Sequence, residues 1–261
     1  MKRVLFGLAC LLAAWTPTAG AEEIRAWDIA GTRVSIDPLP EGGARATISR
    51  DGAQPLTLDA RGLRLREPAD DNLTGTGTPL LALTAWSGGD HCCYTTHIVA
   101  LEPQPRLIQS LDTGPVDVDL FNQFDATPAL EIGLPDTSFI GWPGDGAPSP
   151  LPRVILHWDG SQYVPSAKLM RAGTMLYQMQ ERTQPHNETE AAAAIFKDTL
   201  DMIYAGRIRA ARILLKQLLP PTPENKRLER EFFDCKLPSS PWWPFIAGLN
   251  NMPAKAPACA S

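Results

Sequence analysis

The densest cluster of reactive side chains in this chain lies in one loop, residues 86–94, which reads Trp-Ser-Gly-Gly-Asp-His-Cys-Cys-Tyr. A cysteine beside a histidine can form a thiolate–imidazole pair for nucleophilic catalysis. The loop supplies four candidates for such chemistry: Asp90, His91, Cys92 and Cys93. Together with His97 they are also the residue types that bind zinc. Ser87, in contrast, lacks the G-x-S-x-G elbow of a serine hydrolase.

The spacing of these residues disfavours both a thiolate and a zinc site. Successive side chains of an extended chain point to opposite faces, so His91 would face Cys93, and nothing in the sequence supplies a third group to orient the imidazole. Cys93 and His97 share a face but would lie about 13 Å apart at about 3.3 Å per residue. We therefore expect no catalytic residue, metal or cofactor, and interpret the loop as a structural, oxidised corner.

The first 21 residues are the reason to expect oxidised cysteines. A positive start precedes an uncharged apolar run over residues 4–15 and an Ala19-x-Ala21 site, which is the layout of a secretory signal peptide. Cleavage would leave Glu22 at the N-terminus and place the protein in the periplasm or outside the cell. The apolar run is shorter than the roughly 20 residues that span a bilayer, so we expect no transmembrane anchor.

Four cysteines remain after that cleavage, namely Cys92, Cys93, Cys235 and Cys259. An even number in an oxidising compartment favours disulfides. Neighbouring Cα atoms lie about 3.8 Å apart, below the usual disulfide range of about 4.4–6.8 Å, so a Cys92–Cys93 bond would be a strained ring. Two arrangements stay open: Cys92–Cys93 with Cys235–Cys259, which is slightly favoured, or bonds from the loop to the two C-terminal cysteines.

The charge of the chain restricts its partners. It has 24 basic and 29 acidic residues, for a net charge of −5, and no cluster of Lys or Arg. Binding to a phosphate backbone needs clustered positive charge, so nucleic acid is not expected. The partner we expect is an unidentified protein or another component of the cell envelope.

A β-rich region has to position the reactive loop. Short apolar or alternating runs between Gly, Pro and Asp turns predict strands at residues 24–29, 32–36, 44–50, 63–66, 79–86, 94–101, 106–111, 116–120, 130–134, 154–158 and 162–164. We expect an α+β protein in which residues 22–168 form an antiparallel sandwich or a propeller-like fragment. Trp86, Trp142 and Trp158 are expected in its core rather than on a ligand-stacking surface. His97 and His157 are expected to be strand histidines with satisfied hydrogen bonds.

Residues 169–261 are predicted to form a small helical region. Helices are expected at residues 187–204, with Asn187 as the cap, at 207–219, and from Thr222-Pro223 onward. In the third helix Leu228, Phe232 and Cys235 have the i, i+4, i+7 spacing of one buried face. The proline-rich tail, residues 238–261, is expected to be irregular and packed at its Trp242-Trp243 pair.

Two motifs carry a resemblance to a known family. Residues 72–81 read Asn-Leu-Thr-Gly-Thr-Gly-Thr-Pro-Leu-Leu, and residues 87–93 read Ser-Gly-Gly-Asp-His-Cys-Cys. They resemble exported bacterial proteins with FG-GAP/VCBS-like repeats, in which a D-x-D-G-D-G-x-P-[DE]-L turn precedes a strand and an S-G-G-x-H-C-C loop. Residues 121–130 resemble a second, worn copy, and residues 157–163 resemble the W-D-G-x-x-Y hairpin. The resemblance implies a fold more than a function.

The calcium ligands of that turn are missing here. The family turn binds calcium through carboxylate oxygens, but these positions hold Asn72, Thr74, Thr76 and Leu80. Gly75, Gly77 and Pro79 remain to keep the shape of the turn, and the second copy retains only Asp125. We therefore predict a calcium-free scaffold.

The leading hypothesis is a non-enzymatic, exported scaffold or interaction protein of the bacterial cell envelope. The alternative is an envelope hydrolase, or a thiol or metal protein, that uses the loop of Asp90, His91, Cys92 and Cys93.

Overall fold

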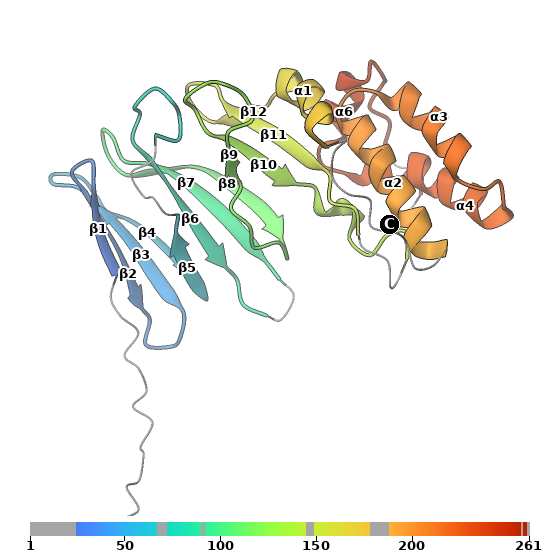
Figure 1. Ribbon diagram of the computed structural model, residues 1–261. Coiled ribbons are helices and arrows are strands. Elements are labelled where there is room, and N and C mark those ends of the chain that lie inside the picture. Colours follow the sequence, from blue (N-terminus) through green and yellow to red (C-terminus); the bar gives the residue numbers. More distant parts are fainter. Residues whose placement is uncertain are drawn as a thin grey trace, which may run out of the picture.

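The structure is a computed structural model that describes residues 25–66, 72–89, 92–144, 149–177, 188–256 and 258–259, without the side chains of residues 173–177 and 188–189. The predicted signal peptide, the predicted cap Asn187, and Asp90 and His91 lie outside these residues. The described residues form three antiparallel sheets followed by helices (Figure 1). The predicted α+β class is therefore confirmed.

Each sheet has four strands, and in each the strands pair in sequence order. Sheet A contains β1 (Arg25–Ile29), β2 (Thr32–Pro38), β3 (Ala44–Ser49) and β4 (Leu56–Ala60). Sheet B contains β5 (Gly62–Leu65), β6 (Leu80–Trp86), β7 (Tyr94–Ala100) and β8 (Arg106–Gly114). Sheet C contains β9 (Phe121–Asn122), β10 (Glu131–Pro135), β11 (Arg153–Trp158) and β12 (Tyr163–Pro165). The three sheets follow one another as successive layers, with sheet B in the middle (Figure 1).

The middle position of sheet B explains why its strands are apolar on both faces. Along β6, Leu81 and Leu83 belong to the core shared with sheet A, whereas Leu80 and Ala82 belong to the core shared with sheet C and the helices. A strand that is covered on both sides reads as a continuous apolar run because side chains alternate between faces.

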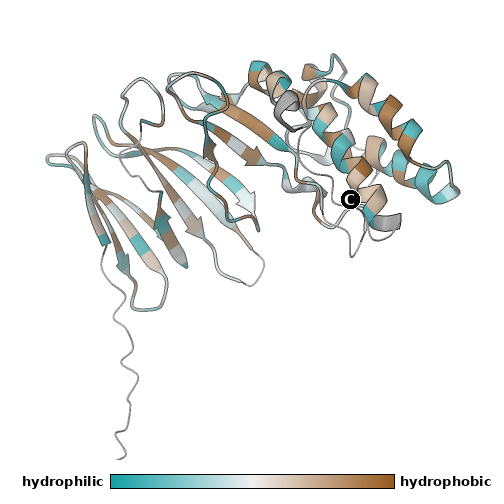
Figure 2. Ribbon diagram, viewed as in Figure 1, coloured by the Kyte–Doolittle hydropathy of each residue, from teal (hydrophilic) through white to brown (hydrophobic). Residues whose placement is uncertain are grey.

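Sheet A is apolar on one face only. Val34 and Ile48 are paired neighbours and are fully buried against sheet B. The register places polar side chains on the other face: Arg33, Ser35, Arg45, Thr47, Thr57 and Asp59. Figure 2 shows this alternation of hydrophilic and hydrophobic residues along the strands of sheet A. The stack of sheets therefore ends at sheet A, because its outer face has no apolar surface to bury.

The helices cover sheet C on the side away from sheet B (Figure 1). They are α1 (Ala167–Tyr177), α2 (Glu188–Tyr204), α3 (Ile208–Leu218), α4 (Pro223–Glu231), the π-helical η2 (Phe232–Lys236), α5 (Leu237–Ser239) and α6 (Trp243–Leu249); a short 3-10 helix, η1 (Thr137–Phe139), follows β10. Trp142 connects the sheet region to the helices. Its ring stacks on Phe232 with centroids 5.3 Å apart, and it meets the ring of Phe196 edge-on with centroids 4.4 Å apart. No helix within the described ranges has the length and apolar character needed to cross a membrane.

A buried polar network also ties sheet C to the helices. The carboxylate of Asp136, just after β10, accepts hydrogen bonds from the hydroxyls of Tyr204 in α2 and Ser240 after α5, and from the backbone N–H of Ser138. Burial, and then the charge of Asp136, raise the pKa of Tyr204 well above its ordinary value. The phenol therefore remains a donor, and the carboxylate is satisfied inside the core.

Several local predictions are wrong. Residues 116–120 are not a strand, and β4 and α1 form where no strand or helix is predicted. The tail is not irregular throughout, because α6 buries Trp243, Ile246, Ala247 and Leu249. These residues have helical spacing, and a proline is tolerated in the first turn of a helix.

The predicted cap of the third helix is confirmed, since the Thr222 hydroxyl accepts from the Asn225 N–H at 3.2 Å. Cys235 is only half-buried. The π-helical turn of η2 inserts an extra residue per turn, so the i, i+7 relation to Leu228 no longer holds.

Candidate functional site

In the reactive loop, which connects β6 to β7, Cys92 and Cys93 form one cysteine pair. The second cysteine pair is Cys235 and Cys259, which is consistent with the arrangement that the sequence slightly favours. Ser87 binds the backbone of Cys93 twice, through its hydroxyl as acceptor and its N–H as donor, both at 3.0 Å. The indole N–H of Trp86 donates to the Cys92 carbonyl at 3.0 Å. These polar groups therefore hold the loop backbone.

The two strand histidines differ. His97 Nδ1 lies 2.9 Å from the Ser110 hydroxyl, and burial lowers the pKa of the imidazole, so its predicted hydrogen bond is confirmed. His157 lies in a strand as predicted, β11. Its predicted hydrogen bond is not found at Nδ1, which is buried and has no hydrogen-bond partner in the part of the chain that the structure describes. Within that part there is also no group of three or more His, Cys, Asp or Glu side chains that could hold a metal ion.

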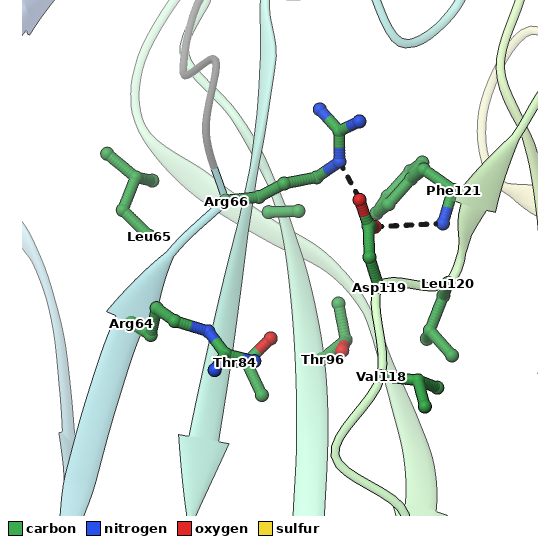
Figure 3. Close-up of a pocket in the computed structure, with 10 residues that line it drawn as sticks. Arg64, Leu65, Arg66, Thr84, Thr96, Val118, Asp119, Leu120 and Phe121 are labelled. Atoms are coloured by element: carbon green, nitrogen blue, oxygen red, sulfur yellow. Dashed lines mark hydrogen bonds and ion pairs between the residues drawn. The ribbon is translucent and has the colours of Figure 1, made fainter.

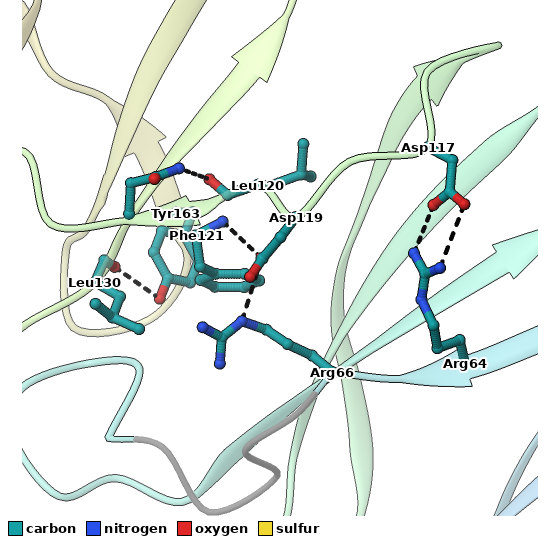
Figure 4. A network of polar contacts seen from close by, with 9 residues as sticks. Arg64, Arg66, Asp117, Asp119, Leu120, Phe121, Leu130 and Tyr163 are labelled. Atoms are coloured by element: carbon teal, nitrogen blue, oxygen red, sulfur yellow. Dashed lines mark hydrogen bonds and ion pairs between the residues drawn. The ribbon is translucent and has the colours of Figure 1, made fainter.

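The structure brings two turn loops together instead. The first turn loop is residues 72–79, before β6, and the second turn loop is residues 123–130, before β10. The Leu130 N–H donates to the Leu73 carbonyl at 3.0 Å. The Tyr163 hydroxyl donates to the Leu73 carbonyl at 3.0 Å. It also donates to the Leu130 carbonyl at 3.2 Å (Figure 4). Burial raises the pKa of Tyr163, so this hydroxyl keeps its proton and joins the loops.

The first turn loop fills its own interior with amide and hydroxyl groups. The Asn72 side-chain oxygen accepts from the Gly77 N–H at 3.0 Å. The hydroxyls of Thr74 and Thr76 lie 2.8 Å apart, and those of Thr76 and Thr78 lie 3.0 Å apart. At three of the four positions where the resembled turn has carboxylates, Asn72, Thr74 and Thr76, this loop therefore uses neutral groups that bond to one another or to the loop backbone.

The second turn loop retains one carboxylate, that of Asp125, and this group and Glu131, the first residue of β10, both bond to the loop. Asp125 accepts from the Thr127 N–H at 2.8 Å. Hydrogen bonds from Thr127, and then the charge of Lys168, hold the pKa of Asp125 below its ordinary value. The buried Glu131 accepts from the Phe124 N–H at 2.7 Å and from the Thr127 hydroxyl at 3.4 Å. Both acids thus stabilise the loop.

A groove of about 520 Å³ lies where the two turn loops meet the end of β11 and the start of α1. Its lining residues are Thr74, Gly75, Thr76, Asp125, Thr127, Pro128, Ala129, Glu131, His157, Trp158, Pro165, Ser166, Ala167, Lys168 and Leu169.

Trp142 is in the core as predicted, but Trp158 is only half-buried and lines this groove. Lys168 has no motif that marks it in the sequence. The groove forms only because the fold joins segments about 90 residues apart.

A smaller hollow of about 200 Å³ lies between sheet B and residues 115–120, which we call the strap (Figure 3). Arg64 makes a two-point ion pair with Asp117, and Arg66 Nε donates to Asp119 at 3.3 Å (Figure 4). The Arg66 guanidinium also lies 5.1 Å from the centre of the Phe121 ring. The acids of the strap thus already engage both arginines, and these contacts fasten the strap to the sheet.

Comparison of the chain with models of protein families, with curated proteins and with solved structures finds no match.

Proposed function

We propose that this protein is an exported scaffold or interaction protein of the bacterial cell envelope, and that it acts by binding rather than by catalysis. The observation that carries the proposal is the groove between the turn loops, with its volume of about 520 Å³. This volume falls in the range of about 300–1,000 Å³ that is common for ligand sites. The groove has an aromatic side chain and a few charged or hydroxyl groups, which is the usual composition of such a site.

The reactive loop supports the same proposal. A disulfide consumes both thiols that a nucleophilic mechanism would need, and export into an oxidising compartment would preserve it. The side chains of Trp86 and Ser87 form hydrogen bonds with the backbone of Cys92 and Cys93, respectively. The cysteine pair then serves as a structural corner at the start of β7.

The alternative function, an envelope hydrolase or a thiol or metal protein, uses the same loop in a reduced state. Cys92 has an exposed side chain, so a reducing partner could reach the disulfide. This alternative requires a thiol that reacts under native conditions, or a metal ion that stays bound to the exported protein.

The test is an intact-mass measurement of the exported protein, native and unreduced, with and without a thiol-blocking reagent. We expect a chain that starts at Glu22 and gains no mass from the reagent. The same sample reduced and unfolded is the control, and there Cys92, Cys93, Cys235 and Cys259 must all react. A chain that still starts at Met1 would contradict cleavage of the predicted signal peptide. A native thiol that reacts, or a retained metal ion, would favour the alternative.

A further inference from the structure

Building on the proposed function, we infer that the groove binds a short, uncharged glycan, with Trp158 as the surface on which a sugar ring stacks. A sugar has apolar C–H faces and hydroxyl groups at its rim, so its site needs an aromatic plane with donors and acceptors around it. The groove lining has this combination, with Trp158, the hydroxyls of Thr76 and Thr127, and Lys168.

The aromatic plane is held in place by the core. Trp158 packs edge-on against Tyr163, with ring centroids 5.4 Å apart and an angle of 62° between the rings. Tyr163 is itself fixed by its bonds to both turn loops. The half-buried indole therefore keeps one orientation in the groove, and a ligand that stacks on it does not have to order it first.

The charges in the groove oppose one another and favour a neutral ligand. Lys168 Nζ lies 3.7 Å from a carboxylate oxygen of Asp125, and the Lys168 side chain is 84% exposed. This distance is longer than a hydrogen bond, so the ammonium can donate to ligand hydroxyls. The other carboxylate oxygen of Asp125 is held by Thr127. Lys168 and Asp125 largely offset each other's charge, and Glu131 is buried and bonded to the second turn loop. Neither a polyanion nor a cation therefore meets an unopposed group of opposite charge in the groove.

The remaining wall supplies hydroxyls and rigid apolar contacts. Thr76 and Thr127 are exposed in the groove, and a hydroxyl both donates and accepts, as sugar hydroxyls do. Pro128 and Pro165 also line the groove, and their rings lose little entropy on binding. These features match a ligand with many hydroxyls and no net charge.

The test is calorimetric titration of the full exported chain with three trisaccharides: maltotriose, cellotriose and tri-N-acetylchitotriose. We expect at least one to bind with a Kd of about 1 mM or tighter, at −4.1 kcal/mol or better. Trp158→Leu should weaken that Kd at least about tenfold, because stacking on an aromatic ring is lost. Lys168→Ala should weaken it by about threefold to tenfold, because a charged hydrogen bond is lost.

Matched variants control for effects on folding. Trp86→Phe changes another half-buried tryptophan, in the reactive loop, and Lys226→Ala removes an exposed lysine of α4; both should leave the Kd within twofold. Lys168 is so exposed that its replacement leaves the core intact, so it tests the groove even where Trp158→Leu lowers the melting temperature.

Three results would overturn the glycan assignment. They are no heat of binding with any trisaccharide at 10 mM, binding that survives both groove substitutions, and binding that responds equally to the control substitutions. A soluble tripeptide library, titrated in parallel, separates this failure from failure of the proposed function. Peptide binding that Lys168→Ala weakens would keep the binding function and overturn the glycan. The intact-mass and thiol-blocking measurement does not depend on either titration.

Discussion

The first and second turn loops occupy equivalent places before β6 and β10, yet their interiors are chemically opposite. In the first, Asn72 and the hydroxyls of Thr74, Thr76 and Thr78 bond to the loop and to one another. In the second, the carboxylates of Asp125 and Glu131 accept from backbone N–H groups. The loops meet at Leu73, Leu130 and the hydroxyl of Tyr163.

This difference shows two ways in which a turn can hold its shape with protein atoms alone. Neutral hydroxyls satisfy each other without the repulsion that clustered carboxylates would suffer, whereas carboxylates need N–H donors close by. The first arrangement should be insensitive to pH, and the second should depend on it. The contact between the loops should matter more for stability than either interior.

The largest loss of stability should come from Gly75→Ala, because this variant disturbs the contact between the two turn loops. A Cβ on Gly75 would lie 2.6 Å from the Ala129 nitrogen and 2.9 Å from its Cα, and the residue has a φ of +70°. Clash and backbone strain together should lower the free energy of unfolding by about 3 kcal/mol. Urea denaturation measures it. Gly77→Ala is the matched control, because its φ is +78° but no atom lies within 4 Å of the added Cβ. An equal loss in both variants would refute the contact.

The next effect should follow from Tyr163→Phe. The hydroxyl is buried and donates to both loop carbonyls. Its removal takes this donor from the Leu130 carbonyl, whereas the Leu73 carbonyl keeps the hydrogen bond from the Leu130 N–H. We expect a loss of about 2 kcal/mol in unfolding free energy, measured by urea denaturation. Tyr94→Phe, at the start of β7 and far from the turn loops, should cost much less. If Tyr163→Phe were as stable as the parent chain, the hydrogen bonds of this hydroxyl to the two turn loops would not contribute to stability.

A smaller effect should appear when the carboxylates of the resembled turn are restored. The parent chain should show no change in melting temperature with calcium, because the first turn loop carries no carboxylate. The triple variant Asn72→Asp, Thr74→Asp, Thr76→Asp should be less stable in EDTA, because the buried Thr74 becomes charged. Calcium at about ten times its Kd should then return about 1.4 kcal/mol. A calcium response in the parent chain would contradict a calcium-free first loop.

The smallest effect should be a pH-dependent change in the hydrogen bond between Asp125 and Thr127, confined to the second turn loop. Because the pKa of Asp125 is lowered in the folded protein, its hydrogen bond from Thr127 stabilises the second turn loop above the ordinary Asp pKa of about 3.9. This contribution is lost as the pH falls below that value through the lower folded pKa. The NMR shift of the Thr127 N–H should therefore move between pH 5 and pH 2.5, while that of the Gly77 N–H, bonded to the amide of Asn72, stays constant. Equal movement of both signals would argue against the assignment of the two interiors.

The amino-acid sequence alone determined the class and many of the elements. The alternation at residues 44–50 predicts β3, and Thr222-Pro223 predicts the start of α4 with its cap. These features are local, since side-chain periodicity and capping depend on residues a few positions apart. The interiors of the turn loops are local for the same reason.

Only the tertiary structure decided how the sheets stack and which residues form the groove. Residues 116–120 alternate like a strand, but their acids pair with Arg64 and Arg66, more than 50 residues away, instead of extending a sheet. Leu73 and Tyr163 are 90 residues apart in sequence yet share a hydrogen bond, and Lys168 joins Asp125 because α1 begins beside the second loop. Local patterns record which face of an element is apolar. They do not record which distant element covers it, because that choice depends on packing and on hydrogen-bond partners that form only when the chain is folded.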